Sequence, residues 1–156
     1  MNEQNLVSFL VEAKARTYAA QDDDASVAPL LNGSRQLEYQ LGDFHYRDIY
    51  FGFRSFVGQE VVEFHGRPVW SMAYAGGVTD AALSEDQVRD VYRILRKALS
   101  MVAPSHVYRG PAHVEIDGYS YRNMAAGGLA DFSGREEIRY DQRVVYALNY
   151  CGGLIR

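Results

Sequence analysis

The chain has 156 residues, 47% of them hydrophobic and 23% charged, which predicts one globular domain over residues 1–156 with a core of its own. Its 16 basic and 20 acidic side chains give a net charge of −4 without a basic cluster, so we expect no nucleic-acid partner. The single cysteine, Cys151, excludes an internal disulfide and a cysteine-based zinc site, and it fits a cytoplasmic location. No apolar run reaches the length of a membrane span and the N-terminus lacks a signal-peptide pattern, so we expect no membrane partner either.

The first expected element is a helix over residues 5–19, followed by a loop over residues 21–34. Lys14 is placed outside the apolar stripe of this helix, which consists of Leu6, Phe9, Leu10, Ala13 and Thr17. The loop is long enough for a lid or a mobile connection. Its three aspartates at 22–24 lack the spaced oxygen ligands of a calcium-binding loop, so we interpret them as a solvated acidic segment.

Strands are expected at residues 36–41 and 44–51, joined by a turn at Gly42 and Asp43. The second of these strands is aromatic on both faces and carries Arg47 and Asp48 in its middle, which argues against a solvated edge. Because a buried charge needs a partner, we expect Arg47 to meet a carboxylate such as Glu60.

The second helix is the clearest local signal in the chain. Ser84 and Gln87 form a capping box at its start, and Pro104 marks its end. Its apolar stripe consists of Val88, Val91, Leu95, Ala98, Leu99 and Val102, and its basic outer face is interpreted as solvated surface. Strands at residues 113–116 and 119–126 are expected to follow it.

Residues 56–78 are repeated, with a shift of 76 positions, at residues 132–154. Eight of the 23 positions are identical in FVGQEVVEFHGRPVWSMAYAGGV and FSGREEIRYDQRVVYALNYCGGL, and a shift of 75 aligns Tyr46 with Tyr121. Two copies of a module over residues 1–78 and 79–156 are therefore expected. Each copy is a helix followed by three or four antiparallel strands, which predicts an α+β fold of two α-βββ modules related by a pseudo-twofold axis.

Each repeat has the pattern of a β-hairpin, with a two-residue turn at residues 65–66 and again at 141–142. With such a turn and regular pairing, one face would carry Glu60, Val62, Phe64, Val69 and Ser71, and the other Val61, Trp70, Met72 and Tyr74. Both faces would then be apolar, so we expect both to be covered. Cys151, in the last strand, is interpreted as a buried structural thiol.

Glu60 and Glu136 are the sharpest candidates for chemistry because the repeat puts them at equivalent positions. Two carboxylates in a shared cleft could bind a cation or act as general acid and base. Alternatively, each forms a structural salt bridge, Glu60 with Arg47 and Glu136 with Arg122. The four histidines have no metal-site spacing, and neither a nucleophile elbow nor a glycine-rich nucleotide loop occurs, so we expect no metal and no cofactor.

The string FHYRDIYFG at residues 44–52, followed by FVGQEVV and PVWSMAY, resembles the bacterial domain-of-unknown-function family 5680. FLVEAKARTYA at residues 9–19 is similar to the opening of that family, whereas Phe53 replaces a second glycine that the family tends to have. Members occur alone or behind a helix-turn-helix DNA-binding domain. The resemblance implies a sensor or effector domain for small molecules, without established catalytic residues.

The leading hypothesis is a small-molecule-binding domain with a pocket between the two modules for an aromatic or cationic ligand. The candidate ligand-binding residues are Tyr46, Asp48, Tyr50, Glu60, Trp70, Tyr74, Tyr121, Glu136, Tyr146 and Tyr150. They are expected on both strand faces, so that at most half line one cavity. The 12 tyrosines also fit a second interpretation, in which they are simply strand formers.

Two other classes of function remain open. A hydrolase would use Glu60 or Glu136 as its general base, and would need a carboxylate with a raised pKa and no arginine partner. A protein-interaction module would use an exposed aromatic patch or a sheet edge, including pairing with a second copy as a homodimer.

Overall fold

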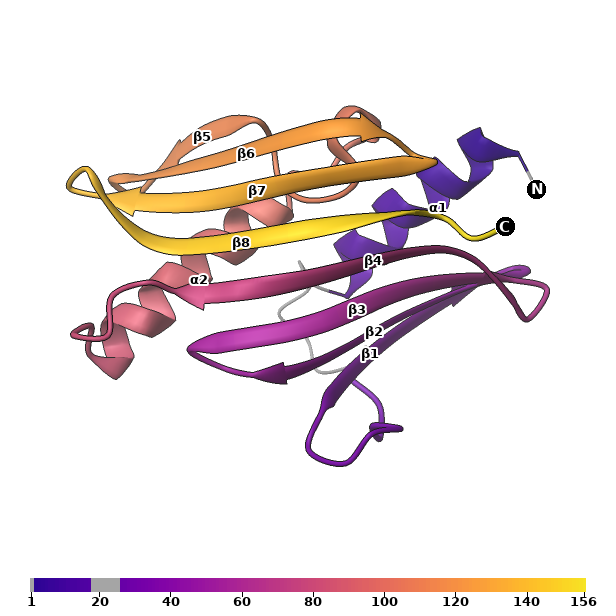
Figure 1. Cartoon of the computed structure of the whole chain (residues 1–156), viewed down its shortest axis with the longest axis horizontal. Coiled ribbons are helices and arrows are strands. Elements are labelled where there is room, and N and C mark those ends of the chain that lie inside the picture. The colour runs from indigo at the N-terminus through magenta and orange to yellow at the C-terminus, as the bar shows by residue number, and fades with distance from the viewer. Residues whose placement is uncertain (1, 18–25) are drawn as a thin grey trace.

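The computed structural model describes residues 2–17 and 26–156, so the aspartates at 22–24 lie outside the described residues. In this part of the chain, eight antiparallel strands form one sheet in the order β1-β2-β3-β4-β8-β7-β6-β5. Helices α1 (Glu3–Arg16) and α2 (Glu85–Leu99) lie on the same face of this sheet, behind it in Figure 1. The expected α+β class is therefore confirmed.

Each half of the chain contributes four strands to the sheet, the larger of the two expected numbers, so that each half is α-ββββ rather than α-βββ. The strands are β1 (Arg35–Leu41), β2 (Phe44–Gly52), β3 (Ser55–Phe64), β4 (Arg67–Val78), β5 (His113–Ile116), β6 (Tyr119–Gly128), β7 (Asp131–Tyr140) and β8 (Arg143–Leu154). A short 3₁₀ helix, η2 (Pro104–His106), follows α2 and leads into an irregular segment that reaches β5. The strand at the end of each half, β4 or β8, lies at the centre of the sheet, and the two pair with each other.

Both hairpin turns are confirmed as two-residue turns, with positive φ at His65, Gly66, Asp141 and Gln142 as a type I′ turn requires. The face assignment from the sequence, however, is wrong. The β3–β4 register shifts between Val62 and Glu63, and the β7–β8 register shifts at the equivalent place. Beyond this bulge Glu60 pairs with Met72, so these two side chains lie on the same face rather than on opposite faces.

Only one face of the sheet is covered by the helices. On the opposite face, the central strands β4 and β8 carry the exposed side chains of Ala73, Ala75 and Cys151. The expectations of two covered faces and of a buried Cys151 thiol are therefore wrong. Cys151 pairs with Ala73 and alternates with Tyr150, which points to the helix-covered side and is 3% exposed.

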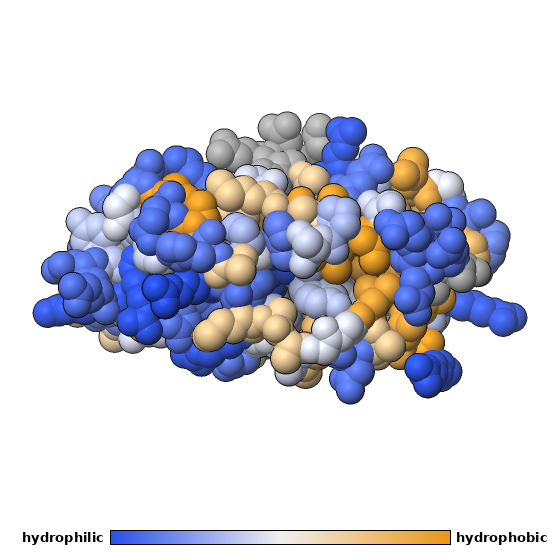
Figure 2. All heavy atoms as spheres, turned by 90° about the horizontal axis from the view of Figure 1, so that it is seen from above, coloured by the Kyte–Doolittle hydropathy of each residue, from blue (hydrophilic) through white to orange (hydrophobic). Residues whose placement is uncertain are grey.

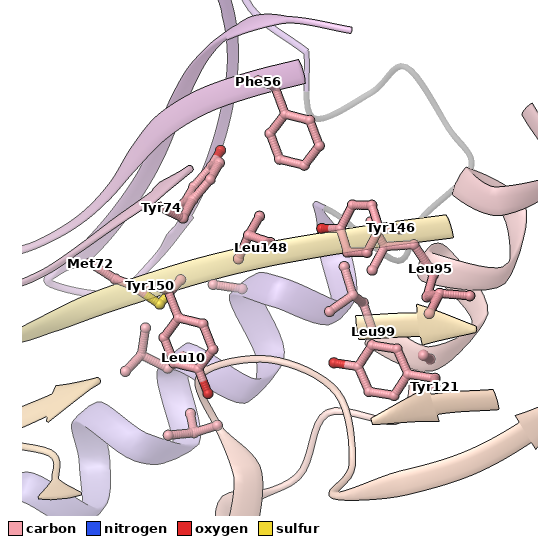
Figure 3. Close-up of a cluster of buried hydrophobic side chains, with 14 of the residues drawn as sticks. Leu10, Phe56, Met72, Tyr74, Leu95, Leu99, Tyr121, Tyr146, Leu148 and Tyr150 are labelled. Carbon is pink, nitrogen blue, oxygen red and sulfur yellow. The ribbon is translucent and has the colours of Figure 1, made fainter. Parts of the chain in front are cut away.

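The core fills the space between the helices and the covered face. Leu10 of α1 and Leu95 and Leu99 of α2 pack near Met72, Tyr74, Tyr121, Tyr146, Leu148 and Tyr150 of the sheet (Figure 3). Full burial of one such aliphatic side chain stabilises the fold by about 1.5–3 kcal/mol.

Tyr74 and Tyr150 face each other across the central pair of strands, β4 and β8. Each ring lies over a glycine of the neighbouring strand, Gly58 in β3 and Gly134 in β7. A Cβ at either glycine would collide with the tyrosine ring. The two rings can therefore lie against the sheet only because these positions have no side chain.

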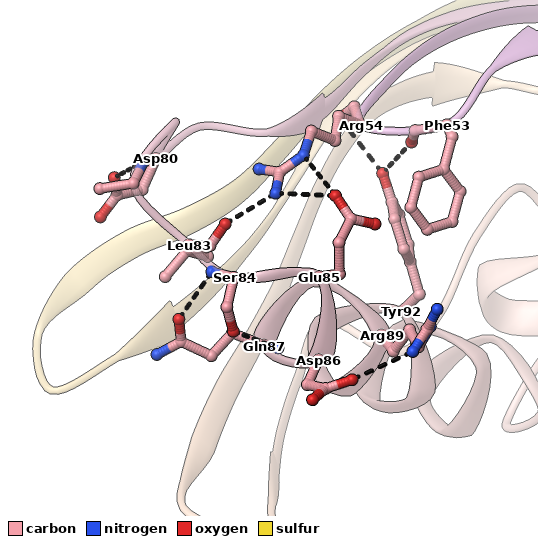
Figure 4. A network of polar contacts seen from close by, with 11 residues as sticks. Phe53, Arg54, Asp80, Leu83, Ser84, Glu85, Asp86, Gln87, Arg89 and Tyr92 are labelled. Atoms are coloured by element: carbon pink, nitrogen blue, oxygen red, sulfur yellow. Dashed lines mark hydrogen bonds and ion pairs between the residues drawn. The ribbon is translucent and has the colours of Figure 1, made fainter.

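The N-terminus of α2 is tied to the turn between β2 and β3 (Figure 4). The Ser84 hydroxyl accepts from the Gln87 amide and the Gln87 side chain accepts from the Ser84 amide, which confirms the capping box. Arg54 donates to the Leu83 carbonyl at 2.7 Å and pairs with Glu85 at 3.1 Å. The first half of the chain thus holds the helix of the second half in place.

Seen from the β5 edge, hydrophilic residues gather at the end of the sheet where β7 passes into β8 (Figure 2). Arg139, Asp141 and Gln142 are exposed there. None of the helices in residues 2–17 and 26–156 is long and apolar enough to cross a membrane.

Candidate functional site

Five ionisable side chains are buried between the helices and the sheet. They come from α1, β2, β3, β7 and the segment after η2: Lys14, Asp48, Glu60, Glu136 and Arg109, with exposed fractions of 6, 0, 1, 0 and 2%. Removing a charge from water costs several kcal/mol unless partners compensate for it. The partners of these groups therefore show which charges the fold has satisfied.

The carboxylate of the second half is fully satisfied. Arg109 Nη2 donates to Glu136 Oε1 at 2.5 Å, and the hydroxyls of Tyr146 and Tyr121 donate to its two oxygens at 2.8 and 2.6 Å. The backbone amide of Gly110 donates to the Tyr121 hydroxyl at 3.0 Å. Three donors around one buried carboxylate are the arrangement expected of a structural anchor.

Asn123 completes this network on the neighbouring strand, β6. Its Oδ1 accepts from the Tyr150 hydroxyl at 2.8 Å, and its Nδ2 donates to the Gly110 carbonyl at 2.9 Å. The irregular segment at Gly110 is thereby fixed to the sheet by hydrogen bonds from both of its backbone polar groups.

The first half has a similar set of residues with fewer bonds. Lys14 Nζ donates to Glu60 Oε2 at 2.5 Å and to the Tyr108 carbonyl at 2.8 Å, and the Tyr74 hydroxyl donates to Asp48 Oδ1 at 2.7 Å. The other carboxylate oxygens, Asp48 Oδ2 and Glu60 Oε1, have no hydrogen-bond partner within residues 2–17 and 26–156, nor has Trp70 Nε1. Here the polar groups are buried without being saturated.

A small cavity adjoins this unsaturated cluster. Its volume is about 10 Å³, roughly the room of one water molecule, and its walls are Lys14, Glu60, Leu99, Val102, Tyr108 and Arg109. Charged groups form one part of the wall and apolar side chains the other. The cavity therefore has room for one water-sized polar group, with Glu60 on one side of it and Leu99 and Val102 on the other.

Electrostatics in the cluster favour one extra proton. Burial and the neighbouring Glu60 carboxylate raise the pKa of Asp48 to about 8, against the lowering by its hydrogen bond from Tyr74. Burial also disfavours the charged form of Lys14 and lowers its pKa, although the bond with Glu60 opposes this. With all five groups ionised, three negative and two positive charges leave −1, and a proton on Asp48 makes the cluster neutral.

Both cations also contact aromatic rings. Lys14 Nζ lies 5.8 Å from the ring centroid of Trp70, and the guanidinium carbon of Arg109 lies 5.7 Å from that of Tyr74. Cation–π contacts of this kind stabilise a desolvated cation by about 2 kcal/mol. The aromatic faces of Trp70 and Tyr74 thus contact the two cations of the chain itself.

The family model described as Domain of unknown function (DUF5680) matches residues 48–155. The chain belongs to this family. Searches of curated proteins and of solved structures found no match. The matched range begins at Asp48 and includes Glu60, Arg109 and Glu136, whereas Lys14 on α1 precedes it.

In this member of the DUF5680 family, all ten candidate ligand-binding residues lie on the helix-covered face. Nine are buried and Tyr50 is half-buried, whereas the sequence had distributed them over both faces. That expectation is wrong because the bulge moves Glu60 onto the side of Trp70 and Met72. Of the ten, only Glu60 lines the cavity, so the two hairpins do not enclose it between them.

The expected salt bridges of the two glutamates are also wrong. Arg47 alternates with Asp48 along β2 and points to the opposite face, where it pairs with Glu38 at 2.8 Å and Glu63 at 3.7 Å. Arg122 likewise alternates with Asn123 and is exposed. The cations that reach Glu60 and Glu136 come instead from α1 and from the segment after η2.

Lys14 and Arg109 were therefore missed as site residues, and the first could have been found. Lys14 follows Leu10 by four positions, which places it on the buried side of α1, but its charge suggested the outer face. Arg109 has no such signal because it lies in an irregular segment without periodicity. In the part of the chain that the structure describes, no group of three His, Cys, Asp or Glu side chains could hold a metal ion.

Proposed function

We propose that this protein is a small-molecule-binding, sensor-like domain whose ligand binds beside Glu60, between the helices and the first half of the sheet. One observation carries the proposal. Glu60 is 1% exposed and lines the cavity, yet its Oε1 has no hydrogen-bond partner among the described residues. A ligand that donates a hydrogen bond there would satisfy it.

The cost of the unsaturated cluster supports this proposal. A buried polar atom without a partner destabilises a fold by about 1–3 kcal/mol, and the first half has three such atoms, on Asp48, Glu60 and Trp70. Stability is commonly given up in this way where a protein binds or reacts, and perturbed carboxyl groups cluster at functional sites. The Glu136 carboxylate of the second half, with its three donors, is the internal comparison.

We also propose that residues 1–78 and 79–156 are copies of one module, joined in a single domain about a pseudo-twofold axis. The strand order is symmetric about the central pair, with β1-β2-β3-β4 on one side and β5-β6-β7-β8 running inward from the other. The bulges at Val62/Glu63 and Ile138/Arg139 are 76 positions apart, the same shift as in the repeat. Tyr74 pairs with its own counterpart, Tyr150. An experimental structure in which the halves superpose by a rotation far from 180° would contradict this.

A thermal-shift screen of the purified protein tests the binding proposal. The library should contain metabolites and drugs of all charges, each well above its expected dissociation constant. A ligand at 100 times its dissociation constant adds about 2.7 kcal/mol of stability, which is several degrees of melting temperature for a chain of this size.

The variant Glu60→Gln should lose the shift, whereas Glu63→Gln should keep it. Glu63 is the matched control because it lies on the same strand, but on the outer face, where it pairs with Arg47. A shift that survives Glu60→Gln would place the ligand elsewhere. No shift across the whole library would argue against a binding domain.

A hydrolase with Glu60 as general base is the second candidate function. The water-sized cavity beside Glu60 also contacts Lys14 and Arg109, which could stabilise a negative charge formed on a substrate. Glu136 is the poorer base because three donors already occupy it. Chromogenic ester and phosphoester substrates test this candidate, and turnover that is equal in wild type and Glu60→Gln would reject it.

A further inference from the structure

The two halves differ in hydrogen bonding at one pair of corresponding buried positions. Asp48 corresponds to Asn123 with a shift of 75, and each accepts a hydrogen bond from the tyrosine of the same half. Asn123 also donates, to the Gly110 carbonyl, whereas the second oxygen of Asp48 has no partner among the described residues. The first half thus has a carboxyl group with an oxygen that has no partner among the described residues, where the second half has an amide whose two polar atoms are both bonded.

The atoms without partners show which ligand chemistry fits. Asp48 Oδ2 and Glu60 Oε1 are both acceptors, and these two residues are direct cross-strand neighbours in β2 and β3. The cation beside them, Lys14, is already bound to Glu60 and to a backbone carbonyl. Trp70 Nε1 is a donor without a partner among the described residues, so two of the three such atoms in the cluster are acceptors. With all carboxyl groups ionised, the formal charge of −1 favours a monovalent cation over an anion.

The shape of the cavity limits the size of this cation. Room for about one water molecule fits an ammonium group but not a quaternary one. The ammonium group alone fills this room, so a hydrocarbon tail would extend out of the cavity past Leu99, Val102 and Tyr108, the apolar part of the wall. We infer that the ligand is a small primary ammonium cation with a short apolar tail, whose N–H groups donate to Glu60 in the wall of the cavity and whose charge lies beside Asp48, the cross-strand neighbour of Glu60. This inference rests on the proposed binding function.

The bound cation would take the place of a proton. Asp48 is faced by Glu60 from β3, Tyr74 from β4, Lys14 from α1 and Arg109 from the segment after η2. Because burial and Glu60 raise the pKa of Asp48 to about 8, the free protein keeps this carboxyl protonated at pH 7. Binding of an ammonium group then releases about one proton, and the affinity rises as the pH is raised from 7 to 9.

Isothermal titration calorimetry with butylammonium tests the inference on the wild-type chain. Butan-1-ol, which lacks the charge, and butyltrimethylammonium, which lacks the N–H donors, are the controls. Butylammonium should bind at least about tenfold more tightly than either, since a charge-assisted hydrogen bond contributes about 1.5–3 kcal/mol. Titrations at pH 7 in phosphate and in Tris should differ in enthalpy by the ionisation heat of about one proton.

Two variants locate the binding. Asp48→Asn installs the residue of the second half and keeps an acceptor for Tyr74, and it should weaken butylammonium binding by about tenfold to a hundredfold and abolish the proton release. Glu63→Gln should bind like the wild type. The buffer comparison on the wild type stands even where Asp48→Asn does not fold.

Equal binding of butylammonium and butan-1-ol, or binding without proton release, would overturn the ammonium assignment. A different result would overturn the proposed binding function itself. A thermal-shift hit among neutral or anionic compounds that depends on Glu60 would keep the binding domain and reject the ammonium ligand. No hit of any charge, butylammonium included, would reject both.

Discussion

At the residue scale, Asp48 is a carboxyl group whose environment differs strongly from water. It is fully buried, and its cross-strand neighbour on β3 is another carboxylate, Glu60. The pKa of Asp48 is about 8 in the folded protein, compared with its usual 3.8 in an unfolded chain. The folded state therefore keeps a proton that the unfolded state releases between about pH 4 and pH 8.

This linkage predicts a pH-dependent stability that Asp48→Asn removes. The contribution of Asp48 is complete below pH 4 and is lost as the pH rises through 8, because the folded state binds more protons in this range. Relative to the wild type, the free energy of unfolding of the variant should therefore rise by up to about 1.4 kcal/mol for each pH unit between pH 4 and 8. Urea unfolding at pH 5, 6.5 and 8 measures the difference, and parallel curves would contradict the raised pKa.

A second prediction concerns the saturated carboxylate. Arg109→Ala leaves Glu136 buried with only its two tyrosine donors, and it should lower the free energy of unfolding by about 3 to 5 kcal/mol. Arg139→Ala is the control, since Arg139 pairs with Glu137 on the exposed face and should change stability by less than about 1 kcal/mol. Chemical denaturation at pH 7 compares them, and equal losses would refute the structural role of Arg109.

Single residues of the site were partly predictable from the sequence. The repeat pointed to Glu60 and Glu136, and the tyrosines and Trp70 that surround them were named from the same alignment. Their partners were missed for two different reasons. Lys14 has the spacing of the buried side of α1 but was set aside because of its charge, whereas Arg109 lies in an irregular segment whose packing no local pattern encodes. A pattern of hydrophobic residues cannot assign a charged side chain such as Lys14 to the buried face of a helix.

At the element scale, the hairpins are specified by their turns but not by their registers. The turns at 65–66 and 141–142 follow from sequence, whereas each bulge adds one residue without a distinctive residue type. A register error of one residue reverses every side chain of a strand. For this reason the strand positions were predictable to within a few residues while the faces were not.

The glycines under the central tyrosines give a prediction for this scale. Gly58→Ala and Gly134→Ala each place a Cβ against a tyrosine ring, which should lower the free energy of unfolding by about 1–3 kcal/mol. Gly128→Ala is the control, because its Cβ would meet no atom within 4 Å and its φ is not positive. Melting temperatures of the three variants report the effect, and equal values would show that the rings can move aside.

The start of α2 gives a further prediction. Ser84→Ala removes the side-chain acceptor of the capping box and should lower the free energy of unfolding by about 1 kcal/mol. Ser84→Asp should restore most of the loss, since aspartate caps equally well and suits the positive end of the helix. Denaturation midpoints test this, and an Asp variant as weak as the Ala variant would show that the cap is not the cause.

At the scale of the whole molecule, the central pair β4 and β8 joins both halves into one sheet, and both helices cover the same face. The two layers enclose five ionisable groups, and their satisfaction differs between the halves: Glu136 has three donors, whereas Glu60 and Asp48 each retain an oxygen without a partner among the described residues. The second half holds its charges for the fold. The first half, on our account, holds them for a ligand.

The stability of the double variant Lys14→Met/Glu60→Leu tests this account most directly. Apolar side chains of similar size can often replace a buried ion pair without loss or with a gain of up to about 4 kcal/mol, and the Lys14–Glu60 pair should behave in this way if it does not hold the fold together. Guanidinium denaturation measures the free energy of unfolding of both proteins. An unchanged or higher value is the result we predict, and a loss of more than about 2 kcal/mol would show that this pair, like that of Arg109 and Glu136, exists to hold the fold together.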